Sequence, residues 1–440
     1  MAEPQVATDV KPEQSRKRPR SRSRSRSPPR QRKRPGATAR ITHAEKEQQE
    51  QRRRQREQEQ QAALVNAAKD RGIQQGVTNF YNELQQRGRD WRNTESKIKN
   101  LRNYNNWAKS VLIHKFSPRE DFTPGGGYGS QQQGLMVLDI GVGKGGDLQK
   151  WQKAPQRVQR YIGVDPAEVS INQARERHAD MRRKNHRTLR ADFFVQDGYG
   201  ESLEKIDAVR EVGFDPNVGP AVGGSSRWGG GGFDVVVMMF CMHYAFESLE
   251  KANGMLRNTS GALKKGGRFF GVIPNSDVLR ENVQRFYEKQ EKQEKQDPPQ
   301  KAESDDSDEK VAHESSVNKE SGPQWGNSLY RVHFPTKTAK DGTFRPPFGW
   351  KYNYFLEEAV EVPEYVVPFE AFRALAEDYN LELQYKKPLL EIWDEERRDP
   401  ELGRLSVLMR VSDRPGGELN LSQEEREAVG LYHAFCFYKV

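Results

Sequence analysis

Residues 135–147 read LMVLDIGVGKGGD, a short apolar run that ends in a cluster of glycines. An apolar run of this length predicts a buried strand, and the residues after it have helical spacing. Glycine lets the chain turn sharply and approach a ligand without a Cβ clash. Gly141, Gly143 and Gly146 fit the spacing G-x-G-x-x-G of a dinucleotide-binding turn, which is a weak signal when it stands alone. The stretch therefore predicts a strand, a glycine turn and a helix.

The same alternation continues along the chain. Further buried strands are predicted at RYIGVD (160–165), DFFVQD (192–197), FDVVVMM (233–239) and GRFFGVI (267–273). Stretches with helical spacing separate most of them, as at 167–178 and 244–265. Alternating strands and helices predict an α/β fold of Rossmann-like type with a mainly parallel sheet. In such sheets ligands bind at the carboxyl ends of the strands.

Acidic residues stand at two of these strand ends. Asp165 ends the second strand, and Asp197 ends the third. A carboxylate in the position of Asp165 can accept hydrogen bonds from both ribose hydroxyls of a nucleotide. The alternative is a glycine-rich turn with ordinary helix-capping aspartates, which explains each feature singly but not the glycine turn and both carboxylates together. The pattern favours a cofactor that contains adenosine.

The composition separates a basic tail from a folded body. Of 440 residues only 34% are hydrophobic and 31% are charged, which is too polar for one compact domain. Residues 11–40 hold 13 Lys and Arg and one Glu, so their local charge is +12. Because the net charge of the whole chain is +9, the other 410 residues together carry a charge of −3. We expect residues 1–75 to be a disordered Arg/Ser-rich tail that attracts phosphate groups and is typical of nuclear import signals. A merely solubilising tail is the alternative.

Residues 80–440 are expected to form one domain of catalytic size. Two segments within it predict disordered insertions: a Gly-rich loop at 213–232, and a charged stretch at 288–320 with 11 acidic and six basic residues. Two cysteines cannot form a disulfide framework, which indicates a reducing compartment. Because no apolar run approaches 18 residues and no hydrophobic signal core begins the sequence, we expect neither a membrane nor a secreted protein.

Six stretches in order, spanning about residues 80–440, together resemble the eukaryotic mRNA cap guanine-N7 methyltransferases of fungal type. They are LRNYNNWAKSVLI (101–113), VLDIGVGKGGDLQKW (137–151), IGVDPAEVSINQARER (162–177), FDVVVMMFCMHYAFES (233–248), FGWKYNYFLEEAVEVPEYVV (348–367) and LYHAFCFYKV (431–440). The glycine loop is generic, whereas NNWxKS and FCMHYAFES are specific to the family.

The resemblance implies a fold, an activity and partners. The implied fold is that of class I methyltransferases, a mainly parallel sheet with helices on both faces. The implied reaction transfers a methyl group from S-adenosylmethionine to N7 of the terminal guanosine of the 5′ cap, GpppN, of nuclear mRNA, and leaves S-adenosylhomocysteine. The implied partners are capped mRNA and the transcription or capping machinery of RNA polymerase II, in the nucleus and without a metal ion.

The resemblance also implies roles for single residues. Positions that bind S-adenosylmethionine in the family correspond to Lys109, Gly141, Asp165, Asp197, Met239 and Tyr244. Positions that contact the cap or lie beside it correspond to Asn105, Asn106, Lys144, Lys150, Arg177, His243, Glu364 and Tyr432. Met239 departs from the Gln of many members, so we expect contact there through backbone or packing. The loop reads GVG where GCG is more usual.

These roles are chemically reasonable. N7 of guanine carries a lone pair and no proton, so in-line positioning suffices and no general base is assigned. Glu364 has only acceptors when ionised, which matches the N1–H and N2 amine donors of guanine. The plain alternatives are a solvent-facing Glu364 in a turn after proline, a core His243, and a solvated helix face that carries Asn105 and Lys109.

Three other functions stay open from the residues alone. Another class I methyltransferase, acting on a different RNA site or on a small molecule, has the same cofactor loop. An NAD-dependent oxidoreductase shares the loop and Asp165 but explains neither NNWxKS nor Glu364. A noncatalytic RS-type adaptor of RNA processing explains the tail but not a complete cofactor site.

Overall fold

The computed structural model describes residues 74–83, 91, 95–123, 133–220, 227, 229–296 and 322–440. All of them belong to one compact unit, residues 68–440. Of the predicted Arg/Ser-rich tail, residues 1–73 lie outside the described residues. So do residues 221–226 and 228 of the Gly-rich segment and 297–321 of the charged segment.

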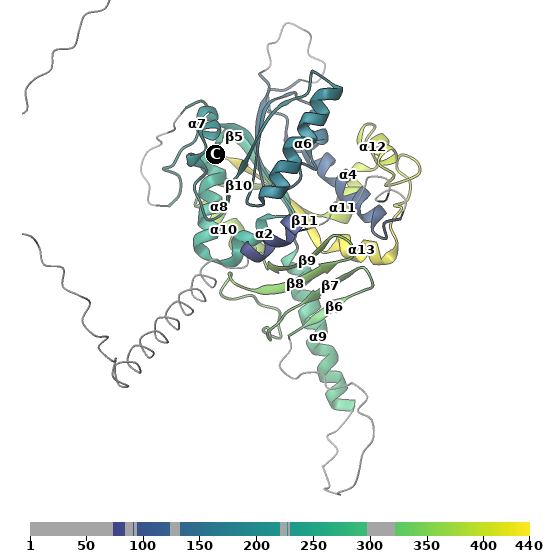
Figure 1. Cartoon of the computed structure of the whole chain (residues 1–440). Coiled ribbons are helices and arrows are strands. Elements are labelled where there is room, and N and C mark those ends of the chain that lie inside the picture. The colour runs from purple at the N-terminus through teal and green to yellow at the C-terminus, as the bar shows by residue number, and fades with distance from the viewer. Residues whose placement is uncertain are drawn as a thin grey trace, which may run out of the picture. The chain divides into compact units, whose positions relative to one another are not determined.

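The central sheet has seven strands in the order β10-β11-β5-β4-β1-β2-β3 (Figure 1). The strands are β1 (Leu135–Ile140), β2 (Val158–Asp165), β3 (Arg190–Val195), β4 (Phe233–Met239), β5 (Leu263–Pro274), β10 (Leu381–Pro388) and β11 (Tyr432–Lys439). The five strands β1 to β5 pair in parallel, and β11 is antiparallel to both of its neighbours. The mainly parallel, Rossmann-like sheet that the sequence predicts is confirmed.

Helices cover both faces of this sheet, as predicted. Successive residues of a strand point to opposite faces, and in β1 Leu135 and Val137 belong to one core cluster while Leu138 and Ile140 belong to the other. The first cluster packs under α4 (Lys99–Phe116), α5 (Leu148–Gln152), α6 (Glu168–Lys184), α11 (Leu389–Glu396), α12 (Leu402–Leu408) and α13 (Gln423–Gly430). The second packs under α7 (Asp207–Val212), α8 (Leu249–Ala262) and α10 (Phe369–Glu377).

A second, antiparallel sheet lies at the carboxyl edge of the first. Its strands are β6 (Gln324–Gly326), β7 (Tyr330–His333), β8 (Lys351–Leu356) and β9 (Val360–Tyr365), in that order. It follows α9 (Ser276–Gln296) in the chain, and β9 packs on the 3₁₀ helix η2 (Met242–Glu247) that comes after β4. Helix α2 (Gln74–Glu83) contacts both α6 and β9 (Figure 1). These elements surround the strand ends at which a ligand is expected.

The structure differs from the sequence expectation inside both expected insertions. Helix α9 continues to Gln296, so residues 288–296 are helical. They consist of Glu, Lys and Gln, which are good helix formers, and the first proline after them is Pro298. In the Gly-rich segment Phe214 and Val218 are buried, and Asp215 N donates to Gly261 O at 2.8 Å. Two apolar side chains and one backbone hydrogen bond are enough to hold residues 213–220 against the body.

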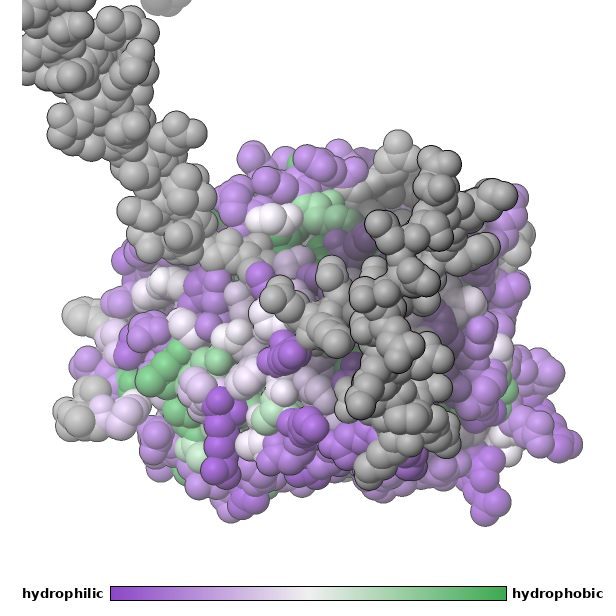
Figure 2. Space-filling view, turned by 90° about the horizontal axis from the view of Figure 1, so that it is seen from below, coloured by the Kyte–Doolittle hydropathy of each residue, from purple (hydrophilic) through white to green (hydrophobic). Residues whose placement is uncertain are grey.

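The surface seen from below in Figure 2 is mainly hydrophilic, with hydrophobic residues in small separate patches. Among the helices of the described residues, none is both long enough and apolar enough to cross a bilayer.

Candidate functional site at the carboxyl edge of the sheet

The turn after β1 is built from glycines with positive φ. Gly141, Gly143 and Gly145 have φ of 80°, 50° and 68°. A Cβ on Gly141 would lie 2.5 Å from Sγ of Cys241, so no other residue fits there. Gly146, the third glycine of the predicted spacing, has open space around it. The sequence therefore identified the turn, but the third glycine with positive φ is Gly145 and not Gly146 of the predicted spacing.

Asp165 holds this turn against the end of β2. Its Oδ2 accepts a hydrogen bond from Gly143 N, and its Oδ1 accepts one from Ala167 N, both at 2.9 Å. Burial raises the pKa of Asp165, and the two backbone donors oppose that effect. The carboxylate lies where the sequence predicted it, beside the glycine turn.

Hydrogen bonds tie the ends of β1, β3 and β4 together. Asp197 lies just past β3, and its Oδ1 accepts from Tyr199 N at 2.9 Å. The hydroxyl of Tyr199 donates to the carbonyl of Cys241 at 3.0 Å, and Sγ of Cys241 donates to the carbonyl of Ile140 at 3.1 Å. The turn that carries Asp197 is thus fixed relative to the glycine turn.

An ionic cluster joins α4, the glycine turn and α5. Asp147 accepts from Nζ of Lys109 at 2.9 Å and from Nζ of Lys150 at 2.8 Å, and Lys150 also donates to Oδ1 of Asn106 at 2.8 Å. Burial alone would raise the pKa of Asp147, but the two ammonium groups hold it well below its usual range. Asp147 was not among the predicted site residues. Its place directly after the glycines, between two predicted lysines, was the signal that could have found it.

The two remaining predicted cations lie close to this cluster in the fold. Lys144 is half-buried within the glycine turn, and Arg177 is exposed on α6. Burial lowers the pKa of Lys150, Asp147 opposes that effect, and the charges of Lys109 and Arg177 add to it. Lys109 and Arg177 are therefore each near enough to Lys150 to repel it, which favours an anion beside these cations.

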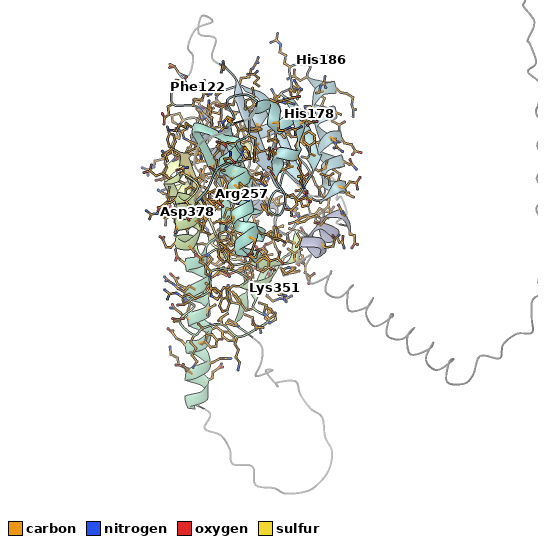
Figure 3. All side chains as sticks on the ribbon, turned by 90° about the vertical axis from the view of Figure 1, so that its left-hand side faces the viewer. Phe122, His178, His186, Arg257, Lys351 and Asp378 are labelled. Carbon is orange, nitrogen blue, oxygen red and sulfur yellow. The ribbon has the colours of Figure 1, made fainter. Side chains whose placement is uncertain are left out.

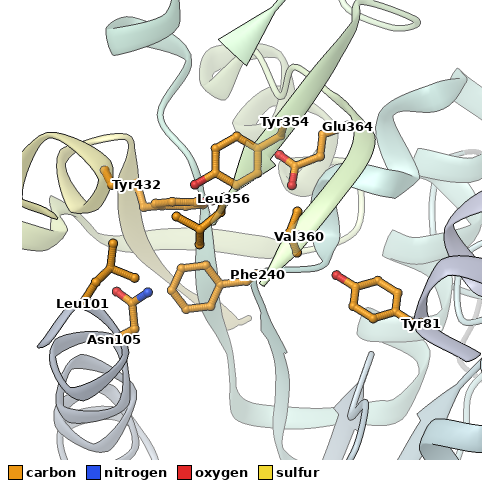
Figure 4. A pocket seen from close by; sticks show the side chains of 10 residues that line it. Tyr81, Leu101, Asn105, Phe240, Tyr354, Leu356, Val360, Glu364 and Tyr432 are labelled. Carbon is orange, nitrogen blue, oxygen red and sulfur yellow. The ribbon is translucent and has the colours of Figure 1, made fainter. Parts of the chain in front are cut away.

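A cavity of about 160 Å³ adjoins α4, the helix that carries Lys109, and Figure 4 shows the side chains that line this cavity. Its walls come from α2, α4, the end of β4, the second sheet, α13 and β11. The lining residues are Tyr81, Leu101, Asn105, Phe240, Tyr354, Leu356, Val360, Glu364, Ala428 and Tyr432. Three predicted cap residues, Asn105, Glu364 and Tyr432, thus meet in one cavity. Oδ1 of Asn105 is buried and has no hydrogen-bond partner among the described residues.

Aromatic rings form one wall of the cavity. The ring of Phe240 lies 5.0 Å from the ring of Tyr432 in a T-shaped arrangement, and Nζ of Lys109 lies 5.4 Å from the centre of the Phe240 ring. Phe240 has a φ of 64°, which is rare for a bulky residue. It follows Met239, the buried last residue of β4, so the chain leaves the sheet under local strain and turns its aromatic ring into the cavity.

Glu364 is a buried acid with one protein donor. Its side chain is almost completely enclosed, and Oε2 accepts from the hydroxyl of Tyr352 at 2.7 Å. Tyr352 stands opposite Glu364 in the β8–β9 register. Burial raises the pKa of Glu364 to about 7, and the Tyr352 hydroxyl opposes that effect. The solvent-facing alternative for Glu364 is therefore wrong.

His243 lies beside Glu364. Its Nε2 is 3.5 Å from Oε1 of Glu364, and neither ring nitrogen has a hydrogen-bond partner among the described residues. Burial lowers the pKa of His243 to about 3, so the ring is neutral at pH 7. Buried ring nitrogens usually have a hydrogen-bond partner, but both nitrogens of the buried His433 in β11 also lack one among the described residues, so the missing partners alone do not distinguish His243 from a core histidine. The two polar side chains predicted to face the cap are thus buried, adjacent and only partly bonded.

Tyr244 and Tyr81 complete this side of the site. The Tyr244 ring centre is 4.3 Å from that of His243, and burial raises the pKa of Tyr244 well above its usual value. Burial and the charge of Glu364 also raise the pKa of Tyr81, which α2 brings to the cavity. Sequence reasoning missed Tyr81. The only signal was the aromatic pair Phe80-Tyr81 where large apolar residues return after the tail.

Within the described part of the chain, no three His, Cys, Asp or Glu side chains are grouped so as to hold a metal ion. The predicted residues fall instead into two sets. One surrounds the glycine turn: Lys109, Gly141, Lys144, Lys150, Asp165, Asp197, Asn106 and Arg177. The other surrounds the cavity: Asn105, Met239, His243, Tyr244, Glu364 and Tyr432.

A Rossmann-like sheet with a glycine turn after β1, a carboxylate at the end of β2 and, at the same edge, an aromatic-walled cavity that contains a buried glutamate defines an α/β protein of the nucleotide-cofactor class. Residues 64–297 and 304–440 match the mRNA (guanine-N(7))-methyltransferase domain. The chain belongs to this family, as the resemblance of its motifs indicated.

Three fungal proteins named mRNA cap guanine-N(7) methyltransferase illustrate the similarity. The one from Neosartorya fischeri is 56% identical over 397 residues, which cover 86% of this chain and 58% of that protein. The one from Aspergillus clavatus is 53% identical, over 86% of this chain and 71% of its own length. The one from Schizosaccharomyces pombe is 39% identical, over 78% and 76%. The match thus spans little more than half the length of the Neosartorya fischeri relative.

Proposed function

We propose that the protein transfers a methyl group from S-adenosylmethionine to N7 of the terminal guanosine in the 5′ cap of mRNA. The family to which the chain belongs supports this reaction. The observation that carries the proposal is the buried pair of Glu364 and His243, with Glu364 in the wall of a cavity that Asn105 and Tyr432 also line. This pair presents acceptors for a purine edge where a cofactor-bound methyl group can reach the same base.

The residues around the glycine turn fit S-adenosylmethionine. The backbone at Gly141 leaves no room for a Cβ, and Asp165 presents a carboxylate at the neighbouring strand end. In the proposed complex Asp165 accepts hydrogen bonds from the ribose hydroxyls, and Asp197 lies on the adenine side. When bound, S-adenosylmethionine supplies a methyl group activated by a sulfonium. Lys109, Met239 and Tyr244 complete the binding site.

Glu364 selects guanine in this proposal. Its ionised carboxylate accepts from N1–H and from the N2 amine together, while Tyr352 keeps it oriented. Adenine presents an acceptor at N1 and would leave the buried carboxylate unpaired, which is strongly unfavourable. Asn105 and Tyr432 line the same cavity and hold the base in place.

The electrostatics of the cavity suit methylation at N7. The guanine gains a positive charge when the methyl group arrives, and an ionised Glu364 next to the base stabilises that charge. His243 is neutral because burial lowers its pKa to about 3, so it adds no opposing positive charge. No proton leaves N7, and positioning by the cavity walls replaces a general base. Lys144, Lys150 and Arg177, with Asn106, hold the triphosphate bridge.

One experiment tests the reaction. The protein is incubated with S-adenosylmethionine labelled in its methyl group and with RNA that is either GpppG-capped or uncapped. We expect label in the capped RNA only, in a form that nuclease digestion releases as 7-methylguanosine cap. Label in uncapped RNA would point to another RNA methyltransferase, and no transfer would favour a noncatalytic adaptor.

A thermal-shift measurement distinguishes the proposed methyltransferase from an NAD-dependent oxidoreductase. A ligand that binds only the native state raises the midpoint of unfolding. We expect S-adenosylhomocysteine to raise it and NAD to leave it unchanged. The opposite result would contradict the assignment of the glycine turn.

We also place the protein in the nucleus, with the transcription or capping machinery of RNA polymerase II as its neighbour. The basic Arg/Ser-rich sequence before residue 74 supports this placement through its charge. Removing residues 1–73 should reduce nuclear accumulation and leave turnover of a dinucleotide cap near normal. A truncated protein that is inactive on the dinucleotide would show that the tail belongs to the catalytic machinery.

A further inference from the structure

Helix α6 carries cations along one flank that leads away from the site. Arg177 and Lys184 are seven residues apart, which is two helical turns, so they lie on the same flank about 10 Å apart along the axis. Both are exposed, and Arg187 follows in the loop after the helix. His186, in the same loop, lies at the end of the body opposite Lys351 of the second sheet (Figure 3).

Helix α5 runs beside this flank and adds cations to it. Oε1 of Gln152 in α5 accepts from the backbone N of Leu189 at 2.7 Å, so the end of α5 touches the loop that carries Arg187. Lys153, directly after α5, is exposed. At the other end, Arg177 lies near enough to Lys150 to lower its pKa further. Cations thus extend from the Asp147 cluster along the junction of α5 and α6.

This junction is strongly positive compared with the rest of the body. Residues 175–190 contain seven Lys and Arg against Glu176 and Asp180. Some of these cations serve the fold, since Arg175 donates to Phe193 O and Arg183 pairs with Asp180. Lys184 and Arg187 form no ion pair with any residue that the structure describes. The charged groups of Lys184 and Arg187 are therefore exposed to solvent and stabilise no ion pair within the described part of the chain.

We propose that the α5–α6 basic seam, formed by Lys153, Arg177, Lys184 and Arg187, binds the phosphodiester backbone of the transcript downstream of the cap. The inference rests on the proposed function. With the triphosphate at Lys150, the next phosphates of a transcript meet Arg177 and then Lys184 and Arg187. Exposed ammonium and guanidinium groups bind phosphates regardless of base sequence and release counterions, so the seam adds affinity that depends on RNA length and on salt.

The test compares two double charge reversals in the full-length chain. Lys184→Glu/Arg187→Glu alters the seam, and Lys289→Glu/Lys292→Glu makes the same change of charge on exposed positions of α9. Methyl transfer is measured on the GpppG dinucleotide and on a capped RNA of about 20 nucleotides. We expect the seam variant to raise KM for capped RNA about tenfold and to leave kcat and KM for GpppG unchanged. The α9 variant should match the parent on both substrates.

Salt dependence gives a second readout. Losing two phosphate contacts should reduce the slope of log affinity against log salt concentration by about 1.4, since each contact to single-stranded nucleic acid contributes about 0.7. The slope is measured by fluorescence anisotropy with an uncapped RNA of the same length. The N-terminal tail is common to all three proteins and does not affect the comparison.

The outcomes separate the seam from the proposed function. If the parent transfers no methyl group to GpppG, the proposed function fails, and the anisotropy measurement still tests the seam. Equal RNA affinity in parent and seam variant, or equal losses in the two variants, would overturn the proposal. If the Glu variant does not fold, as judged by its melting temperature, Lys184→Gln/Arg187→Gln serves instead. It should then show a smaller loss in the same direction.

Discussion

Asp165 and Asp147, on the glycine-turn side of the site, each accept hydrogen bonds from two protein donors, whereas the polar groups on the side of the second sheet have fewer partners among the described residues. Asp165 accepts from two backbone N–H groups, and Asp147 accepts from two ammonium groups. Across the cavity, Glu364 accepts from one hydroxyl, and the ring nitrogens of His243 have no partner among the described residues. Burial raises the pKa of Glu364, while the cations hold that of Asp147 below its usual range.

This difference separates two tasks. Carboxylates that accept from two protein donors fix the loops before any ligand arrives and keep acceptor capacity for a ligand, which suits a rigid site for the proposed cofactor. Buried polar groups with unused hydrogen-bonding capacity are costly until a ligand satisfies them, so they reward only the ligand that has the matching groups. Specificity is thus expected on the side of the second sheet, and structural order on the side of the glycine turn.

The largest effect is expected for Glu364→Gln. An amide keeps one acceptor but turns its NH₂ toward a guanine donor, so kcat/KM on a GpppA cap should fall about 10³-fold, somewhat less than the 10⁴–10⁵ for a complete mismatch. The preference for guanosine over inosine, which lacks the N2 amine, should weaken. Initial rates on the guanosine cap and on the inosine cap measure both changes. The affinity for S-adenosylhomocysteine, measured by calorimetry, is the control.

Tyr352→Phe is the matched control for Glu364→Gln, because Tyr352 donates the hydrogen bond that Glu364 accepts. It removes one hydrogen bond and leaves the carboxylate, so a loss of about fivefold to tenfold is expected. If Glu364→Gln methylates guanosine caps at the parental rate, another residue recognises the base.

Asp165→Ala should weaken S-adenosylmethionine binding about 100-fold, because two hydrogen bonds to a charged acceptor are lost. Calorimetric titration measures the affinity. Asp165→Asn keeps one acceptor and should lose less. Unchanged affinity in the Ala variant would remove Asp165 from the cofactor site.

Asp147→Asn tests the contribution of the glycine-turn side to the free energy of unfolding. A carboxyl whose pKa is depressed in the folded state stabilises the protein above its unfolded pKa, and this contribution is lost as pH falls through the folded pKa. The variant should therefore be less stable by about 2 kcal/mol at pH 7, and the difference should narrow below about pH 4. Urea unfolding across that range measures it. A difference that does not change with pH would show that Asp147 acts through packing.

A pH dependence of cap binding is also expected. In the proposed complex only an ionised Glu364 accepts both guanine donors, and burial raises the pKa of this carboxyl to about 7 in the free protein. Affinity for GpppG should rise about tenfold between pH 6 and pH 8 and then level off, whereas in Glu364→Gln it should stay flat. Because this pKa lies above its unfolded value, the same carboxyl makes folding stability fall as pH rises from about 4.5 to 7. A parental affinity without this rise would mean that Glu364 is ionised throughout.

The glycine-turn side could be predicted from sequence because it depends on local order. A strand, a glycine turn and a helix follow one another, and parallel strands bring their carboxyl ends to one edge, so Gly141 and Asp165 had to meet. Asp147 was overlooked because an aspartate that begins a helix is ordinarily a cap. Lys150 is a local partner, but Lys109 comes from α4, 38 residues earlier, and no local pattern reveals that contact.

The side of the second sheet could not be predicted from residues alone. Glu364 and His243 were identified by resemblance, and a glutamate after proline would otherwise be assigned to an exposed turn. Its burial depends on the pairing of β8 with β9 and on the packing of β9 against η2, which are contacts between distant segments. Tyr81 shows the same limit, since α2 reaches the cavity from before the first strand of the sheet.

The position of β11 in the sequence determines when the central sheet and the cavity can be completed during synthesis. This strand comes last among the described strands, yet it lies between β5 and β10 and carries Tyr432 into the cavity. A chain still in synthesis therefore has its first five strands ready while the place beside β5 stays open. Until β11 emerges, β10 has no neighbour and one wall of the cavity is missing. A ribosome that stalls before residue 432 holds a chain that has the residues of the glycine turn but lacks one wall of the cavity.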